Sequence, residues 1–201
     1  SKVRAAIGLD RIRVVGVGGA PISPFINAFF QGFGIEVHLG FGLTETSPVT
    51  HVHTYKDRMP IKLETCGPIL PRTEAKINDD GELLIKGPQV MKGYYKKSAE
   101  TAEVFTEDGW FRTGDIGFID ADGYLTITDR KKDIIITAGG KNVAPQVIEN
   151  RFKNELFIEQ MAVIGDRRKF LVALIVPGFD AVRDWAGKNG IEAQSPSEIA
   201  A

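Results

Sequence analysis

The sequence predicts an α/β plus β fold: the end of a large α/β domain, an antiparallel β subdomain and a small α+β domain. Two observations lead to this. Near the N-terminus a β-branched run, a helical pattern and a second apolar run follow one another, which is the order of a parallel β–α–β unit. Further along, short strands alternate with Asp-Gly turns, and a helix–strand–strand–helix pattern closes the chain. The expected boundaries are 1–60, 61–129 and 130–201.

Composition excludes several classes of protein. The 201 residues are 43% hydrophobic and 25% charged, and 25 basic against 26 acidic residues give a net charge of −1, so no positive field points to nucleic acid. The single cysteine, Cys66, excludes an internal disulfide framework, predicts a buried structural thiol and suits a reducing compartment such as the cytoplasm. No apolar run reaches membrane-spanning length. The chain opens directly into structured sequence and closes on a Ser-Pro-Ser segment, so we expect a piece of a larger protein.

The first part contains two predicted strands and one helix. Residues 12–17 predict a buried strand and residues 35–39 a second, parallel one. The helix between them covers residues 24–33, with Ser23 as a candidate N-cap and Gly34 as its stop.

The second part is predicted to be an antiparallel sheet that is closed or nearly so. Gly81 and Gly123 each follow an aspartate and predict hairpin turns, because Asp-Gly tolerates the positive φ that such turns need. A short helix over residues 98–104 would be capped by Ser98. The four expected strands cover residues 74–77, 82–86, 111–119 and 124–128.

The third part is predicted to be helical at both ends. A helix over residues 144–154 has Pro145 in its first turn, where proline is well tolerated. Strands follow over residues 157–164 and 170–176, and a last helix covers residues 179–188.

The most chemically suggestive stretch is Thr44-Glu45-Thr46, which follows a strand end and a Gly-x-Gly. In open α/β sheets, ligands gather beyond the carboxyl ends of the strands. Thr44 and Thr46 offer hydroxyl groups for phosphate oxygens, and Glu45 offers a hard oxygen ligand for Mg²⁺. A simple helix-capping turn is the alternative, and spacing alone leaves both open.

Two further stretches can each be interpreted either as ligand-binding or as purely structural. Gly18-Gly19-Ala20-Pro21 ends the first strand, where small residues would let a flat ring approach the backbone or would simply make a tight turn. Asp115 follows a glycine inside an apolar strand, a position from which a carboxylate either accepts ribose hydroxyls or caps a turn.

The histidines do not have the spacing of metal ligands. His51 and His53 form a His-x-His pair, but no Cys, Asp or third His stands nearby at ligand spacing, so we expect a surface strand or loop. His38 is expected to pack or hydrogen-bond within its strand.

Five charged residues in a row, Asp129-Arg130-Lys131-Lys132-Asp133, separate two β-rich segments. We call residues 129–133 the charged joint. On composition it is a solvated turn. The alternative is an ordered crossing between two domains whose charges face a bound anion.

Taken together, these stretches resemble the adenylate-forming superfamily, which comprises the acyl-CoA synthetases, the adenylation domains of nonribosomal peptide synthetases and firefly luciferase. The charged joint and the following Ile135-Ile136-Thr137-Ala138-Gly139-Gly140-Lys141-Asn142 are most similar to long-chain fatty-acid CoA ligases. The matching stretches, in order, are residues 18–21, 41–46, 81–88 with 93–95, 110–115, 129–133 and 139–145.

The resemblance implies a nucleotide site. Thr44 would hold the α-phosphate of ATP and Glu45 would ligate Mg²⁺, while Asp115 would accept both ribose hydroxyls with Arg130 close by. Phe41 replaces the usual tyrosine, so ring stacking on adenine would remain but contact through a hydroxyl would be lost. The adenine pocket would be lined by Gly18, Gly19, Ala20, Pro21, Phe41 and Gly42.

The resemblance also implies a moving domain and a second substrate site. Lys132 would be the hinge, and Gly139, Gly140 and Lys141 would face the pantetheine arm of coenzyme A. The implied reaction activates a long-chain fatty acid as acyl-AMP and transfers it to coenzyme A. The family's glycine- and Ser/Thr-rich phosphate loop and its C-terminal lysine are absent from this sequence, so we expect the isolated chain to be inactive.

Two other functions remain open on sequence. An aryl or carrier-protein-loading ligase would share the nucleotide residues. A non-catalytic nucleotide-binding module would not need to retain Thr44, Glu45, Asp115 and Arg130 together. This sequence does not indicate the preferred acyl chain length or the oligomeric state. Fatty acids partition into bilayers, which is compatible with peripheral contact at the inner face of a membrane, but no basic amphipathic helix supports it.

Overall fold

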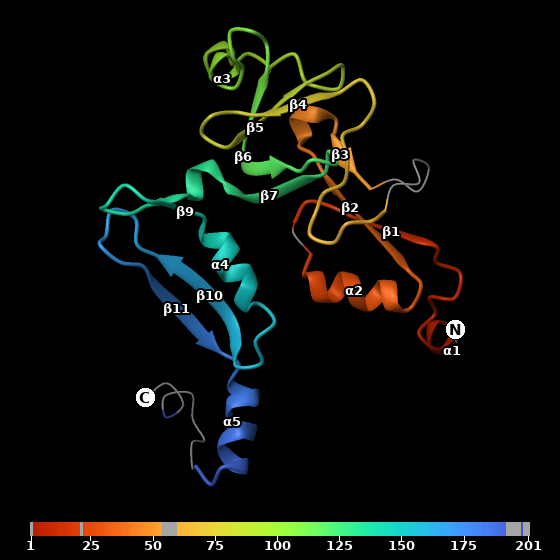
Figure 1. Cartoon of the computed structure of the whole chain (residues 1–201), viewed down its shortest axis with the longest axis vertical. Coiled ribbons are helices and arrows are strands. Elements are labelled where there is room, and N and C mark those ends of the chain that lie inside the picture. Colours follow the sequence, from red (N-terminus) through yellow and green to blue (C-terminus); the bar gives the residue numbers. More distant parts are fainter. Residues whose placement is uncertain (1, 21, 54–59, 192–197, 199–201) are drawn as a thin grey trace. The chain divides into compact units, whose positions relative to one another are not determined.

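The computed structural model describes residues 2–20, 22–53, 60–191 and 198. It divides into two compact units, Ser1–Lys131 and Lys132–Ala201 (Figure 1). Of the predicted site residues, Pro21 lies outside the described residues.

The first unit begins with a three-stranded sheet in the order β1-β2-β3. Strands β1 and β2 are parallel, with Val17 opposite Leu39. Helix α2, which connects the two strands in sequence, lies beside β2 (Figure 1). This confirms the predicted β–α–β unit. Gly34, with a φ of 73°, follows the helix and ends it as expected. The elements are α1 (Lys2–Ala6), β1 (Val14–Val17), α2 (Pro24–Gly32), β2 (Glu36–Phe41), the 3-10 turn η1 (Thr44–Thr46) and β3 (His51–Val52).

The expected burial of the first strand is wrong, and the expected cap of the helix is confirmed in position only. Strand β1 is not buried, since Val14 is 43% exposed, because β1 lies at the edge of the sheet. Burial is concentrated on the central strand, where Val37 is 1% exposed. Ser23 occupies the N-cap position of α2, but its side chain makes no capping hydrogen bond.

The second sheet of this unit is antiparallel, as predicted, with the order β4-β5-β6-β7. Gly81 and Gly123 adopt φ of 84° and 85° in the two hairpin turns. The sheet is open rather than closed, since β4 and β7 do not pair with each other in the part of the chain that the structure describes. Lys97, not Ser98, is the N-cap of α3. The elements are β4 (Glu74–Ile77), β5 (Glu82–Lys86), α3 (Ser98–Glu103), β6 (Phe111–Ile119) and β7 (Leu125–Arg130).

The two sheets of the first unit share one hydrophobic core. Leu39 from β2 packs with Leu83 and Ile85 from β5 and with Leu125 from β7. Cys66 completes this cluster at 9% exposure, and burial raises the pKa of its thiol to about 11. The predicted buried structural thiol is therefore confirmed, and the shared core holds the end of β2 against the antiparallel sheet.

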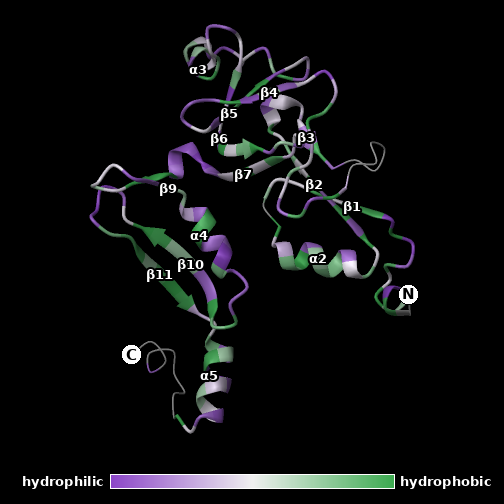
Figure 2. Cartoon of the chain, viewed as in Figure 1, coloured by the Kyte–Doolittle hydropathy of each residue, from purple (hydrophilic) through white to green (hydrophobic). Residues whose placement is uncertain are grey.

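Between residues 132 and 191 the second unit contains two antiparallel strand pairs and the helices α4 and α5. Strands β8 and β9 form a short hairpin, and β10 pairs with β11 while α4 packs on β10 (Figure 1). Strand β11 is hydrophobic along most of its length (Figure 2). Pro145 opens α4, as predicted. None of the described helices is long and apolar enough to cross a bilayer. The elements are β8 (Ile135–Ile136), β9 (Asn142–Val143), α4 (Pro145–Phe152), β10 (Ile158–Ile164), β11 (Val172–Pro177) and α5 (Phe179–Lys188), preceded by the 3-10 turn η2 (Lys131–Asp133).

Candidate nucleotide site

The carboxyl ends of the parallel strands β1 and β2 meet at one sheet edge. Gly18 follows β1 and lies against β2, because a Cβ built on Gly18 would meet the carbonyl oxygen of Gly40 at 3.6 Å. Gly19 has a φ of 82°, and Gly18, Gly19 and Ala20 are all exposed. The structure therefore leaves an uncovered stretch of backbone at the same edge as Phe41, which is the kind of surface that a flat ring can approach.

The turn after β2 is built around Gly42 and Thr46. A Cβ on Gly42 would lie 1.7 Å from the carbonyl oxygen of Pro48, so only glycine fits there. The Thr46 hydroxyl is fully buried, accepts a hydrogen bond from the amide of Leu43 at 2.9 Å and lies 3.0 Å from the Leu43 carbonyl oxygen. Thr46 thus holds the turn together and is not available for phosphate, which corrects the expectation, whereas Thr44 is exposed.

Gly42→Ala should destabilise the first unit by about 3 kcal/mol, because the turn must open to admit the methyl group. Urea unfolding followed by the fluorescence of Trp110, in a Trp185→Phe background, would measure this. Gly16→Ala in β1 is the matched control, since a Cβ at Gly16 meets nothing within 4 Å. Equal unfolding midpoints for the two variants would contradict the assigned role of Gly42.

Glu45 is held in place from two directions. Its Oε1 accepts a hydrogen bond from the Tyr94 hydroxyl at 2.9 Å, and its backbone carbonyl accepts one from the amide of Met91 at 2.7 Å. The bond to the carboxylate raises the pKa of Tyr94, so this hydroxyl stays a donor. The residues that the structure describes contain no group of three His, Cys, Asp or Glu side chains that could hold a metal alone. A cation at Glu45 would therefore need further oxygen ligands, such as phosphates, which is the usual coordination of Mg²⁺.

The histidines behind this turn are buried, which contradicts the predicted surface position. His51 is 0% and His53 4% exposed, because β3 pairs with β2 on one side and His51 bridges to Ile69 on the other. Burial lowers the pKa of His51 to about 4, so its ring is neutral, and it lies 6.3 Å from the ring of Phe41. His38 hydrogen-bonds as expected, with Nδ1 2.6 Å from the carbonyl oxygen of His53.

Asp115 and Arg130 face each other on β6 and β7. They are paired residues in the ladder, and Arg130 Nη1 lies 3.0 Å from Asp115 Oδ1. Asp115 is only 2% exposed, and burial raises its pKa to about 6 although Arg130 acts in the opposite direction. Its second oxygen, Oδ2, is buried and has no hydrogen-bond partner among the described residues. A buried acceptor without a donor is costly, so this oxygen fits a ligand hydroxyl group.

The charged joint is part strand and part exposed turn, so the solvated-turn interpretation holds for its last three residues only. Asp129 and Arg130 continue strand β7, and Asp129 is 1% exposed while its Oδ1 accepts a hydrogen bond from the amide of Arg130. Only the three residues of η2, which include Lys132, form an exposed turn. Arg130 is thereby fixed beside Asp115 by the sheet itself.

The loop of residues 139–141 belongs to the second unit, where it closes the β8–β9 hairpin. Gly140 has a φ of 77°, and the Thr137 Oγ1 accepts a hydrogen bond from the amide of Lys141 at 3.1 Å. Gly139, Gly140 and Lys141 are exposed. The loop is thus a tight, open turn whose backbone a ligand can reach.

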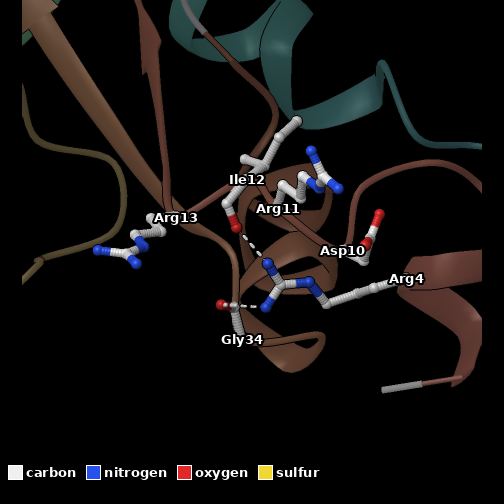
Figure 3. Close-up of a pocket in the computed structure, with 6 residues that line it drawn as sticks. All are labelled: Arg4, Asp10, Arg11, Ile12, Arg13 and Gly34. Carbon is white, nitrogen blue, oxygen red and sulfur yellow. Dashed lines mark hydrogen bonds between the residues drawn. The ribbon is translucent and has the colours of Figure 1, made fainter.

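A surface pocket of about 650 Å³ lies elsewhere, near the start of the chain (Figure 3). Arg4 crosses it and donates to the carbonyl oxygens of Ile12 and Gly34 (Figure 3). It also donates to that of Leu9, so its guanidinium links residues 9–12 to Gly34. The pocket contains none of the predicted site residues. Its lining residues are Arg4, Asp10, Arg11, Ile12, Arg13 and Gly34.

Sequence reasoning missed three polar residues that support the candidate site. Tyr94 bonds Glu45 across 49 positions of the chain, and Lys131 bonds Glu82 across 49. Glu82 begins a strand whose next three residues are apolar and lies in the matching stretch 81–88, but neither observation identifies its partner. Because the partners are distant in sequence, spacing could not have found them.

Comparison with known proteins agrees with this geometry. Residues 2–95 match the family model described as AMP-binding enzyme, and residues 132–197 match the AMP-binding enzyme C-terminal domain. The long-chain-fatty-acid–CoA ligase FadD15 of Mycobacterium bovis is 44% identical over 188 residues, which are 94% of this chain and 30% of that protein. The human long-chain-fatty-acid–CoA ligase ACSBG1 is 39% identical over 181 residues, covering 87% of this chain and 25% of that protein. The chain thus spans a third or less of these relatives.

Solved structures give the same fold. ATP-bound MatB from Rhodopseudomonas palustris superposes with a TM-score of 0.75 at 28% identity, over 92% of this chain and 40% of that chain. The O-succinylbenzoate coenzyme A synthetase MenE from Bacillus subtilis, in complex with ATP and magnesium ion, gives 0.73 at 28% identity, over 87% and 40%.

Proposed function

Since the chain belongs to the AMP-binding, adenylate-forming enzymes, we propose that its full-length parent activates a long-chain fatty acid with ATP and transfers it to coenzyme A. The observation that supports nucleotide chemistry best is the buried Oδ2 of Asp115 beside Arg130, which has no hydrogen-bond partner in the described part of the chain. The long-chain acyl substrate is supported by the names of relatives at 39–44% identity.

The proposed reaction has two steps. A fatty-acid carboxylate oxygen attacks the α-phosphorus of ATP, pyrophosphate leaves, and acyl-AMP forms. The thiol sulfur of coenzyme A then attacks the acyl carbon, AMP leaves with the bonding electron pair, and the thiol proton is released to solvent. The first step needs stabilisation of the negative charge that grows on the α-phosphate. We assign the exposed Thr44 hydroxyl to donate to that phosphate, and Glu45 to hold Mg²⁺, which supplies positive charge to the phosphate oxygens.

The same proposal assigns the nucleoside contacts. The ribose hydroxyls would donate to Asp115, which lacks a donor at Oδ2, while Arg130 keeps the carboxylate ionised. The adenine ring would lie on the open backbone after β1 and stack on the ring of Phe41. The residues assigned to that pocket are Gly18, Gly19, Ala20, Pro21, Phe41 and Gly42.

The second unit is assigned to the thioester step. We infer that it turns about Lys132, so that one active site serves two half-reactions in succession. The exposed hairpin loop of Gly139, Gly140 and Lys141 would then approach the pantetheine arm of coenzyme A. We assign the enzyme to the cytoplasm, where its fatty-acid substrate would bring it into peripheral contact with the inner face of a membrane.

We expect the full-length parent to form palmitoyl-CoA and AMP from palmitate, ATP and coenzyme A with Mg²⁺, measured by chromatography of the products. Benzoate in place of palmitate should give no thioester, and its use would favour an aryl ligase. If AMP formation did not depend on any acid, the proposed function would be wrong. The isolated chain should show no ATP–pyrophosphate exchange, since it spans 30% of the FadD15 ligase. Robust exchange by that chain would overturn this expectation.

A further inference from the structure

Glu82 is a buried carboxylate that bonds residues next to the candidate ribose pair, Asp115 and Arg130. Its side chain is 3% exposed, and its Oε1 accepts a hydrogen bond from the amide of Gly114 at 3.0 Å. Lys131 Nζ lies 2.8 Å from Glu82 Oε2, and Arg112 Nη1 lies 3.6 Å from the same oxygen. Lys131 Nζ also lies 2.6 Å from Asp80 Oδ2 in the β4–β5 hairpin turn.

This arrangement ties Lys131 to the sheet. A buried carboxylate is strongly destabilising unless cations and donors neutralise it, so withdrawing Lys131 would leave Glu82 poorly compensated. The two carboxylates raise the pKa of Lys131, and Lys131 in turn holds the pKa of Asp80 below its usual value. The ammonium group therefore stays charged and bonded across the range in which an enzyme of this kind works.

The contact between Lys131 and Glu82 matters because of where Lys131 lies in the chain. Lys131 directly follows Arg130, and Gly114 directly precedes Asp115. Glu82 thus bonds the neighbour of each member of the Asp115–Arg130 pair. The division between the two compact units falls directly after Lys131, so the last residue of the first unit is the one that is tied down.

We propose that Lys131, Glu82 and Asp80 form a clasp that fixes the end of β7. The clasp has two effects: it positions Arg130 beside Asp115 for the ribose, and it confines rotation of the second unit to Lys132 and the residues after it. The proposal rests on the proposed function for its catalytic consequence but not for its structural one. All three clasp residues are positioning residues, because none of them is placed against the nucleotide.

The structural part is tested on this chain by hydrogen exchange of the amides in residues 128–133. Lys131→Met keeps the length of the side chain but removes its charge, and it should speed exchange there by about tenfold, because charge-assisted bonds to a buried carboxylate are lost. Lys131→Arg should restore slow exchange. Lys97→Met is the matched control, since the ion pair of Lys97 among the described residues is a long one, at 3.8 Å from the exposed Glu100. Unchanged exchange in Lys131→Met, with the β5 amides still protected, would overturn the clasp.

The catalytic part is tested on the full-length parent. Lys131→Met should raise KM for ATP by about tenfold, while Lys131→Arg and Lys97→Met should leave it near the wild-type value. A wild-type KM in a Lys131→Met enzyme whose exchange is accelerated would overturn the positioning role. A parent enzyme without any ATP-dependent activity would instead contradict the proposed function, and the exchange measurement would still decide the clasp.

Discussion

Replacing Glu45 by glutamine in the full-length enzyme should lower kcat/KM for ATP by about 100- to 1,000-fold. Glutamine has nearly the same shape as glutamate and keeps a carbonyl oxygen, but it lacks the negative charge that Mg²⁺ binding requires. Losing a group that stabilises charge on the α-phosphate typically costs about 3–4 kcal/mol of transition-state stabilisation, which corresponds to that range of rates. Steady-state kinetics of AMP formation over a series of Mg²⁺ concentrations would measure the loss.

The Mg²⁺ dependence of the rate distinguishes a metal-binding role of Glu45 from a purely structural role in the turn. Glu45→Gln should need a much higher Mg²⁺ concentration for half-maximal rate. Tyr94→Phe leaves the carboxylate in place and removes only the hydroxyl that bonds it at 2.9 Å. We expect that variant to need roughly three to ten times more Mg²⁺, because the carboxylate is less well oriented. If Glu45→Gln and the wild type responded identically to Mg²⁺, Glu45 would not be the metal ligand.

Local chemistry in the sequence was sufficient to predict most of the fold. The Asp-Gly turns ending at Gly81 and Gly123 lie where expected, because positive φ is a property of the glycine itself. Pro145 opens α4 and Gly34 ends α2 for similar reasons. The errors concern burial, the capping of two helices and the closure of the antiparallel sheet. His51 was expected at the surface, yet β3 is covered on both sides by chain that lies near it only after folding.

For the candidate site too, the sequence was sufficient to find some residues and not others. Glu45 and Asp115 were found by residue type and position at strand ends, since each lies in a stretch that resembles a known motif. Tyr94 and Glu82 also lie in matching stretches, but their supporting contacts could not be found, because these act across 49 and 32 positions of the chain, respectively. The composition of the charged joint predicted only part of its structure: residues 131–133 form an exposed turn, but the β6–β7 ladder pairs Arg130 with Asp115.

Replacing Asp115 by asparagine in the full-length enzyme should lower kcat/KM for ATP by about 100-fold. A ribose would donate two hydrogen bonds to the ionised carboxylate, and each bond to a charged group contributes roughly 1.5–3 kcal/mol. An ATP analogue that lacks both ribose hydroxyls provides the specific control. The wild type should use this analogue about 100-fold less well than ATP, whereas Asp115→Asn should scarcely distinguish the two. Equal discrimination by both enzymes would show that Asp115 does not contact the ribose.

The same substitution should change how the stability of this chain depends on pH. The pKa of Asp115 rises from 3.8 to about 6 on folding. Between these values the folded state holds a proton that the unfolded state has released, so the free energy of unfolding falls as pH rises from about 4 to about 6 and then levels off. The size of this fall is about 3 kcal/mol, from about 1.4 kcal/mol per pH unit. Asp115→Asn cannot titrate, so its stability relative to the wild type should improve by that amount over the same range.

Urea unfolding at pH 4, 5, 6 and 7 would measure this difference. Trp110 lies in the first unit and Trp185 in the second, so a Trp185→Phe background makes fluorescence report on the first unit alone. Other groups titrate alike in both proteins and cancel in the difference. Binding of AMP should reverse the trend, because ribose hydroxyls stabilise the ionised carboxylate and lower the pKa of Asp115. A difference between the two proteins that did not vary with pH would contradict both the raised pKa and the argument that this carboxylate awaits a donor.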